Sequence, residues 1–252
     1  MISLAGRVAL ITGGSRGIGA ATVKLFAQAG ADVIFSYRRN REAALSVVQE
    51  ASAYARVESI KADLTRMADA KAVVSRTIRR FGKLDILVVN AGIWNAEDAP
   101  IEKLTEKSWD EMIRVNLRSI YTITHCAALH MISQRSGRMI IVSSTAAQRG
   151  EAFHSHYAAS KGGAISFVKS LSTELAGRGI LVNCVAPGWV DTDMSRPVLR
   201  TKRGEKLASE IPVGRVATAN EIAGPILFLA SDLATFMTGE IVNVNGGAVL
   251  CG

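Results

Sequence analysis

Residues 7–30 constrain the fold of this chain more than any other stretch. An apolar run at residues 7–12 is followed by glycines spaced Gly-x-x-x-Gly-x-Gly over residues 13–19, and helical periodicity follows at 20–29. Glycines permit a tight turn and let backbone N–H groups approach a pyrophosphate at the start of a helix. Strand, glycine turn and helix together predict the first half of a dinucleotide-binding βαβ unit.

The same alternation of strand and helix continues through the chain. Strands are predicted at residues 32–37, 57–63, 84–92, 139–144, 181–186 and 241–247, and helices at 42–55, 68–81, 108–131, 157–177 and 221–230. This order predicts one doubly wound (Rossmann) α/β domain over residues 1–252, with a mostly parallel seven-stranded sheet and helices on both faces. The polar segment at about 190–212 predicts a mobile lid over the site.

Composition narrows the class of protein. The chain has 252 residues, of which 48% are hydrophobic and 21% charged, typical of a globular protein with a large core. We see neither a signal peptide nor an apolar run of about 18 residues, so we expect a cytoplasmic protein that does not span a membrane. The net charge of +8 fits either a solvated basic surface or attraction to phosphate groups or an acidic partner. No nucleic-acid motif occurs, and Cys126, Cys184 and Cys251 lack metal-like spacing, so no metal site is predicted.

The end of the second predicted strand bears on the choice of cofactor. An NAD-specific site would have a carboxylate there, about 20 residues past the glycines, for the ribose 2′-hydroxyl. Tyr37 occupies that place and Arg38 follows it. Arg38, together with Arg16 in the glycine turn, could pair with a 2′-phosphate, or both arginines could be surface charges. The pattern favours NADP.

The stretch from Ser144 to Lys161 contains candidate catalytic groups. Tyr157 and Lys161 are four residues apart, so they share one face of a helix. A nearby ammonium would lower the pKa of a phenol and let it exchange a proton with a carbonyl or alcohol oxygen near neutral pH. Ser144 ends the preceding strand, where its hydroxyl could hydrogen-bond the same oxygen.

Two further polar residues have both a functional and a structural interpretation. Asp63 ends the third predicted strand, where it could accept a hydrogen bond from an adenine amino group or cap the next helix. Asn116 lies near the middle of a predicted helix, where its amide is locally unfavourable. That position indicates either a functional role or a polar contact inside the protein.

Taken together, these motifs resemble those of the short-chain dehydrogenase/reductase family over essentially the whole chain. The matching motifs are Thr12-Gly13-x-x-x-Gly17-x-Gly19, Asn90-Ala91-Gly92, Asn116, Ser144 with Tyr157-x-x-x-Lys161, and Pro187-Gly188. The C-terminal half, with Pro187-Gly188-x-Val190-x-Thr192-Asp193-Met194 and Thr238-Gly239-Glu240, looks most like the β-ketoacyl-acyl-carrier-protein reductase branch. The resemblance implies an NADPH-dependent ketone reductase, with a β-ketoacyl thioester on acyl-carrier protein as substrate.

The resemblance also implies roles for individual residues. Tyr157 would be the general acid in reduction, Lys161 would lower its pKa and hold the nicotinamide ribose, and Ser144 would polarise the carbonyl. Asn116 would anchor a water that relays protons to Lys161. The implied NADP(H)-binding residues are Gly13, Ser15, Arg16, Gly17, Ile18, Gly19, Tyr37, Arg38, Asp63, Leu64, Asn90, Ala91, Gly92, Tyr157, Lys161, Pro187, Gly188, Val190 and Thr192.

The sequence is compatible with more than one partner and more than one class of substrate. Arg135 and Arg178 match positions where carrier-protein reductases have basic docking residues, although both could be solvated charges, and the family implies a homotetramer. Trp94, Trp189 and the bulky 150–156 loop also fit a free small alcohol, sugar or ketone as substrate. An alternative from another class is a non-catalytic dinucleotide-binding sensor, against which the intact catalytic set argues.

Overall fold

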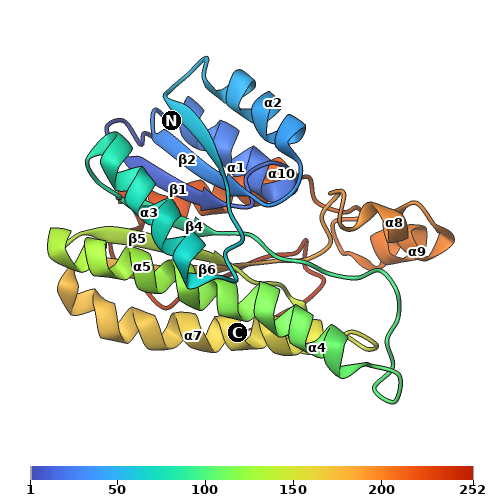
Figure 1. The fold of residues 1–252 in the computed structure, drawn as a ribbon. Coiled ribbons are helices and arrows are strands. Elements are labelled where there is room, and N and C mark those ends of the chain that lie inside the picture. The colour runs from blue at the N-terminus through green and yellow to red at the C-terminus, as the bar shows by residue number, and fades with distance from the viewer. Residues whose placement is uncertain (1, 252) are drawn as a thin grey trace.

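A single sheet of seven parallel strands, in the order β3-β2-β1-β4-β5-β6-β7, forms the centre of the computed structural model, which describes residues 2–251 (Figure 1). The strands are β1 (Val8–Thr12), β2 (Asp32–Tyr37), β3 (Val57–Lys61), β4 (Ile86–Val89), β5 (Gly137–Val142), β6 (Ile180–Pro187) and β7 (Ile241–Val244). The order reverses where β1 lies beside β4, and ligands of such sheets bind beyond the carboxyl ends of the strands at that point. The predicted fold is confirmed, and every strand pair is parallel.

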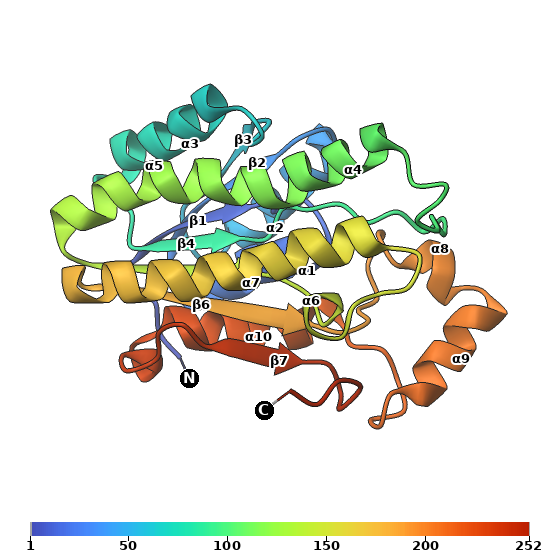
Figure 2. The same ribbon diagram turned by 90° about the horizontal axis from the view of Figure 1, so that it is seen from below.

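Helices cover both faces of the sheet. One face packs against α1 (Gly17–Gln28), α2 (Arg41–Ala51) and α10 (Ala219–Ala230). The other packs against α3 (Met67–Phe81), α5 (Ser119–Gln134) and α7 (Ser155–Leu175). Figure 2 shows α5 and α7 side by side across the second face. Both faces are apolar, which explains the continuous apolar runs of the strands.

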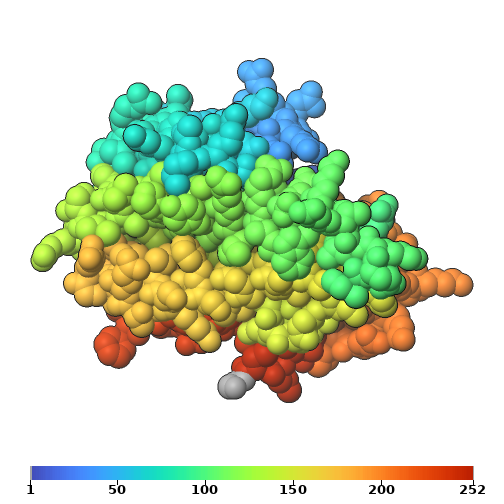
Figure 3. All heavy atoms as spheres, turned by 60° about the horizontal axis from the view of Figure 1, so that its bottom comes forward, coloured from blue at the N-terminus to red at the C-terminus, as the bar shows by residue number. Residues whose placement is uncertain are grey.

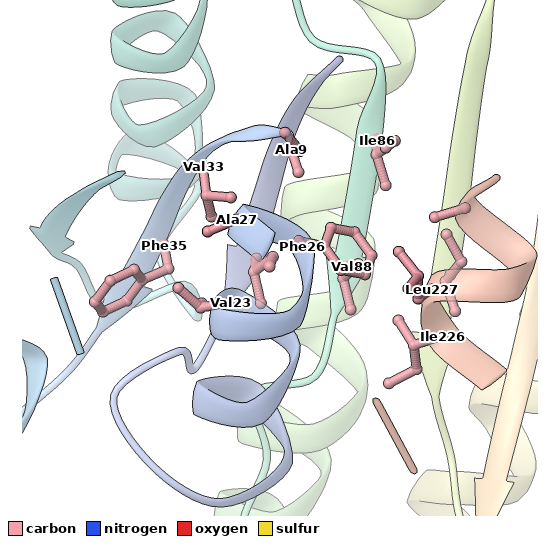
Figure 4. Close-up of a cluster of buried hydrophobic side chains, with 14 of the residues drawn as sticks. Ala9, Val23, Phe26, Ala27, Val33, Phe35, Ile86, Val88, Ile226 and Leu227 are labelled. Carbon is pink, nitrogen blue, oxygen red and sulfur yellow. The ribbon is translucent and has the colours of Figure 1, made fainter. Parts of the chain in front are cut away.

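Alternation along each strand divides the core into two clusters. Successive side chains of a strand point to opposite faces. Ala9 and Ile11 of β1 therefore belong to the cluster under α1, where Phe26 is fully buried, while Leu10 belongs to the cluster under α3 and α5. Figure 4 shows the first cluster, with Phe26 among side chains from β2, β4 and α10. Packing in the two clusters determines which face of the sheet each side chain points to. It therefore also determines the direction in which the chain leaves each strand.

The predicted helix at 108–131 is interrupted in the structure. The chain forms α4 (Glu106–Ile113), a π-helical turn η1 (Arg114–Arg118), and then α5. Asn116 is in the π-helical turn and is fully buried. A π-helical turn adds a residue to one turn of a helix and is frequent at functional sites.

The polar segment predicted to be a lid contains two short helices, α8 (Arg196–Leu199) and α9 (Lys202–Glu210). They project beyond the carboxyl end of the sheet (Figures 1 and 2), the end at which the short helix α6 (Ala146–Arg149) follows β5. Val190 bridges to Ala217, which joins the two ends of the segment. Its mobility stays a prediction.

The remaining described elements are two short 3₁₀ turns, η2 (Ala176–Arg178) and η3 (Asp232–Ala234). Within residues 2–251, no helix has both the length and the apolar character needed to cross a bilayer.

Candidate active site

A cavity of about 980 Å³ opens at the carboxyl edge of the sheet, beside the β1–β4 switch point. Its walls come from the ends of β1, β2, β4, β5 and β6, so segments far apart in the sequence meet there. Of the predicted site residues, it brings together Gly13, Ser15, Arg16, Gly17, Ile18, Tyr37, Arg38, Asp63, Leu64, Asn90, Ala91, Gly92, Ser144, Tyr157, Lys161, Pro187, Gly188, Val190 and Thr192. Gly19 and Asn116 do not line it.

The glycine turn has the geometry of a pyrophosphate site. Gly13 has φ +70° and Gly17 has φ +54°, both in the left-handed region that favours glycine. Gly19 lies inside the turn: a Cβ there would be 2.2 Å from the carbonyl oxygen of Gly13. Arg16 at the N-cap makes no side-chain hydrogen bond to the start of α1. The helix start therefore faces the cavity with backbone N–H groups, which fits a dinucleotide.

Arg38 and Asp63 form an ion pair of 3.4 Å at the end of the cavity beyond β2 and β3. Asp63 also accepts hydrogen bonds from the backbone N–H and hydroxyl of Thr65, at 3.1 and 2.8 Å. Burial would raise the pKa of Asp63, but these bonds and the charges of Arg38 and Arg114 outweigh burial and hold the pKa below its usual value. Asp63 thus fixes the turn after β3 and holds Arg38 at the cavity.

Tyr157 and Lys161 lie on α7 and face the end of β5, as their spacing predicts. The Lys161 Nζ donates a 2.9 Å hydrogen bond to the carbonyl oxygen of Val142 and lies 5.9 Å from the centroid of the Tyr157 ring. The Oγ of Ser144 accepts a 3.1 Å hydrogen bond from the N–H of Ala146, and Ser144 lines the same cavity as Tyr157. The predicted proton donor and the predicted carbonyl-polarising group are therefore neighbours in one cavity.

Burial governs the proton affinities of these two groups. It raises the pKa of Tyr157 to about 12, although the hydroxyl of Ser144 opposes the shift and the negative charge of Glu151 adds to it. Burial lowers the pKa of Lys161 to about 8. The expectation that Lys161 lowers the pKa of Tyr157 is not met in this structure. The ammonium lies over the ring and binds Val142 instead of the phenol oxygen.

Asn116 connects the π-helical turn to the loop after β4. Its Oδ1 accepts a 2.8 Å hydrogen bond from the backbone N–H of Ile93, and its Nδ2 donates to the carbonyl oxygen of Ile93 at 2.9 Å. The Nδ2 also lies 3.2 Å from the Oγ of Ser160 on α7. The structure supports the interior-contact interpretation of Asn116, which ties η1, α7 and the β4 loop together. A water relay through Asn116 stays a prediction.

The substrate side of the cavity contains the bulky groups that the sequence analysis associates with a small free substrate. Trp94 stacks on His154 with ring centroids 5.0 Å apart and meets Trp189 edge-on at 5.7 Å. Glu151, from the loop after α6, also lines the cavity. These residues come from three loops, so only their bulk near the pocket could be read from the sequence.

Arg135 and Arg178 lie at the other edge of the sheet. Arg135 caps the end of α5 before β5, and Arg178 ends η2 before β6. The two segments are adjacent, since the N–H of Gly137 donates to the carbonyl oxygen of Gly179 at 3.2 Å. The 21 residues of α7 span about 30 Å between this edge and Tyr157. Within one chain, both arginines are therefore remote from the cavity.

Comparisons with known proteins agree with the site. The sequence model of a family described as Enoyl-(Acyl carrier protein) reductase matches residues 13–249. The 3-oxoacyl-[acyl-carrier-protein] reductase FabG of Thermotoga maritima is 41% identical over 248 residues, which cover 98% of this chain and 99% of the relative. The protein of the same name from Escherichia coli (strain K12) is 39% identical over 244 residues, covering 96% and 97%.

A solved structure of a dehydrogenase/reductase from Sinorhizobium meliloti 1021 superposes with a TM-score of 0.91 at 37% identity, covering 98% of this chain and 97% of its own. The predicted family is thus confirmed. The chain belongs to the short-chain dehydrogenase/reductase family, and it is an oxidoreductase that acts on alcohol or ketone groups with a nicotinamide dinucleotide.

Proposed function

We propose that this protein is an NADPH-dependent reductase of a β-ketoacyl thioester carried by an acyl-carrier protein. The observation that carries the proposal is that Ser144, Tyr157 and Lys161 together line a dinucleotide-sized cavity. The names of the relatives described above, which align over nearly the whole chain, favour the thioester as substrate.

The chain's own groups can supply the proton of a ketone reduction. When bound, the cofactor supplies a hydride for the carbonyl carbon. A buried tyrosine with its pKa raised to about 12 is protonated at neutral pH and can donate its proton to the carbonyl oxygen. Ser144 holds that oxygen by a hydrogen bond, and Lys161 lies beside the ring of the tyrosine that gives up the proton. The product is an alcohol.

NADP preference rests on the groups around the end of β2. Tyr37 occupies the strand end in place of a carboxylate, and Arg38 is held beside the cavity by Asp63. A guanidinium can pair with a phosphate through two parallel hydrogen bonds. We propose that Arg38 and Arg16 bind the 2′-phosphate and that the residues gathered at the cavity bind the rest of NADP(H).

A homotetramer and a carrier-protein partner belong to the same proposal. An apolar groove lies between α5 and α7, bordered by Leu117, Tyr121 and Phe167, and Figure 3 shows these two helices side by side on one face. Two copies that pair this face about a two-fold axis can run antiparallel. Arg135 and Arg178 of one copy then lie towards the cavity of the other, where basic side chains suit an acidic carrier. We also propose a cytoplasmic location.

Absorbance of the nicotinamide tests the function directly. NADPH and NADH are each offered with acetoacetyl-carrier protein, an acetoacetyl thioester and a panel of free ketones. Turnover of the thioester with NADPH is the expected result. Turnover of free ketones alone would keep the mechanism and remove the carrier protein, and a preference for NADH would contradict the assignment of Arg38.

The second candidate is a reductase of a free small ketone or sugar. It is favoured by one observation, the packed wall of Trp94, Trp189 and Glu151 on the substrate side of the cavity. Bulky rings there restrict the room for a long acyl chain. Equal turnover of a free ketone and the thioester by the same preparation would favour this candidate.

A further inference from the structure

We propose that Glu151 is a specificity-determining residue, which accepts a hydrogen bond from a donor group on the substrate and disfavours substrates with a negative charge near the reacting carbonyl. The inference rests on the proposed ketone reduction at Tyr157 and adds a substrate class to it. That class is neutral ketones with an O–H or N–H group a few atoms from the carbonyl, which includes thioesters with amide-containing arms.

Glu151 lies where it can contact a substrate. It follows α6 and Gly150, whose φ of +74° turns the chain back towards the cavity. Its side chain is 13% exposed and lines the cavity that also contains Tyr157. Its negative charge is close enough to raise the pKa of the phenol. A group bound at Tyr157 is therefore within the electrostatic range of Glu151.

A rigid support holds the carboxylate. The Nδ1 of His154 lies 3.8 Å from the Oε1 of Glu151. His154 is fully buried and stacked on Trp94. The His154 Nε2 lies 2.9 Å from the carbonyl oxygen of Asn95, and its Nδ1 lies 3.2 Å from that of Ala152. The imidazole thus links the loop after β4 to the loop that contains Glu151.

Further contacts close the same wall. The N–H of Ala99 donates to the carbonyl oxygen of Phe153 at 2.9 Å. Arg203 of α9 pairs with Asp98 at 3.1 Å, which attaches α9 to the loop after β4. Phe153 has φ +65°, a conformation that non-glycine residues adopt only at a cost and that is common at functional sites. The loop that contains Glu151 is thus fastened to the loop after β4, which is in turn fastened to α9.

The surroundings of Glu151 act on its charge in two directions, and their net effect is a pKa above the usual value of a glutamate. Burial raises the pKa of Glu151 and is the largest effect, while the charges of His154, Arg149 and Arg203 and the indole of Trp94 oppose it in part. In its ionised form the carboxylate only accepts hydrogen bonds, so it binds O–H or N–H groups and repels another anion. Since burial weakens screening, this repulsion is felt by a substrate in the cavity.

A pair of substrates with one skeleton tests the inference. Wild-type protein, NADPH and either methyl acetoacetate or the acetoacetate anion give two values of kcat/KM. We expect the neutral ester to be favoured by about 10-fold or more, the size of one like-charge contact at partial burial. The substitution Glu151→Gln keeps the length of the side chain and removes its charge. We expect the substitution to reduce the ester-to-anion ratio of kcat/KM at least about fivefold, mainly by lowering KM for the anion.

A second substrate pair isolates the hydrogen bond. Hydroxyacetone carries a donor beside the carbonyl, and butanone is similar in size without one. We expect Glu151→Asp, which keeps the charge but shortens the side chain, to retain discrimination against acetoacetate and to lose preference for hydroxyacetone. Glu97→Gln is the matched control, since Glu97 borders the same cavity but is exposed, and it should leave both ratios unchanged.

The outcomes separate this inference from the proposed function. Wild-type protein that reduces no ketone would overturn both. Reduction by the wild type with both ratios unchanged in Glu151→Gln would overturn the role of Glu151 alone. If Glu151→Gln fails to fold, as judged by circular dichroism, Glu151→Met provides the same removal of charge, and an unchanged ester-to-anion ratio there would likewise overturn the inference.

Discussion

The Lys161 Nζ lies over the ring of Tyr157, 5.9 Å from its centroid, and donates its 2.9 Å hydrogen bond to the carbonyl oxygen of Val142. The two groups therefore share a buried pocket without a direct bond between nitrogen and phenol oxygen. Burial disfavours the charged form of each, which raises the pKa of Tyr157 to about 12 and lowers that of Lys161 to about 8. The uncharged phenol suits a proton donor.

The buried Lys161 predicts an unusual dependence of stability on pH. Its pKa is 10.5 when unperturbed and about 8 in the fold, so between these values the unfolded chain binds more protons. Stability therefore rises with pH across this window, by about 2 kcal/mol between about pH 7.5 and 9.5 for this group alone. We expect the Lys161→Met protein to lack this rise in stability with pH.

The measurement is urea unfolding of both proteins at the two pH values and one protein concentration. The quantity to compare is the change in unfolding free energy with pH in the wild type and in Lys161→Met. The difference between the two changes isolates Lys161, because Cys184 and other groups titrate in both proteins. Equal pH dependence of unfolding in the wild type and Lys161→Met would contradict a lowered pKa of Lys161.

Replacing Tyr157 by phenylalanine should abolish proton donation with little effect on the fold. The substitution removes one hydroxyl from the cavity that Ser144 also lines. We expect kcat to fall about 10²- to 10⁴-fold, the usual contribution of a positioned acid or base. The Kd for NADPH, measured by fluorescence titration, should change less than about threefold. A residual kcat within about tenfold of the wild type would assign the proton to another group.

The sequence predicted the parts of this molecule that local patterns determine. The glycine turn, the alternation of strands and helices and the Tyr157–Lys161 spacing are encoded within about 30 residues each, so the fold and most of the cavity residues followed from them. Asn116 was recognised as exceptional because an amide is unfavourable in a helix. The π-helical turn around it was missed, since it depends on contacts with Ile93 and Ser160, which are distant in sequence.

Other features required the assembled structure. The pKa direction of Tyr157 depends on burial under several loops, and the spacing of Tyr157 and Lys161 alone indicated the opposite direction. The Glu151–His154–Trp94 wall combines loops that follow β4 and α6, so no single stretch contains its signal. Arg135 and Arg178 are adjacent to each other but remote from the cavity because α5 and α7 both run away from it.

Cofactor preference should depend on Arg38. Removing its guanidinium in Arg38→Ala would cost one charge-assisted pairing with a 2′-phosphate, which is worth about 10- to 100-fold in Kd. We expect weaker binding of NADPH and nearly unchanged binding of NADH in calorimetric titrations. Arg56→Ala is the control, because Arg56 pairs with Asp32 at the start of β2, at the other end of the strands. An equal loss for both cofactors would place the 2′-phosphate elsewhere.

Two glycine substitutions should have opposite consequences for stability. In Gly19→Ala, the new Cβ would lie 2.2 Å from the carbonyl oxygen of Gly13 and 2.6 Å from the Nδ2 of Asn90, so the glycine turn must move. We expect the free energy of unfolding to fall by about 1–3 kcal/mol, the usual cost of overpacking, and we expect the Kd for NADPH to rise in the same variant.

In Gly177→Ala the Cβ meets nothing within 4 Å and the residue is exposed. Stability there should stay level or rise by about 0.5 kcal/mol, because alanine restricts the unfolded chain. Urea unfolding and NADPH titration of both variants check this contrast, and a Gly19→Ala protein that binds NADPH as tightly as the wild type would show that the turn is not the pyrophosphate site.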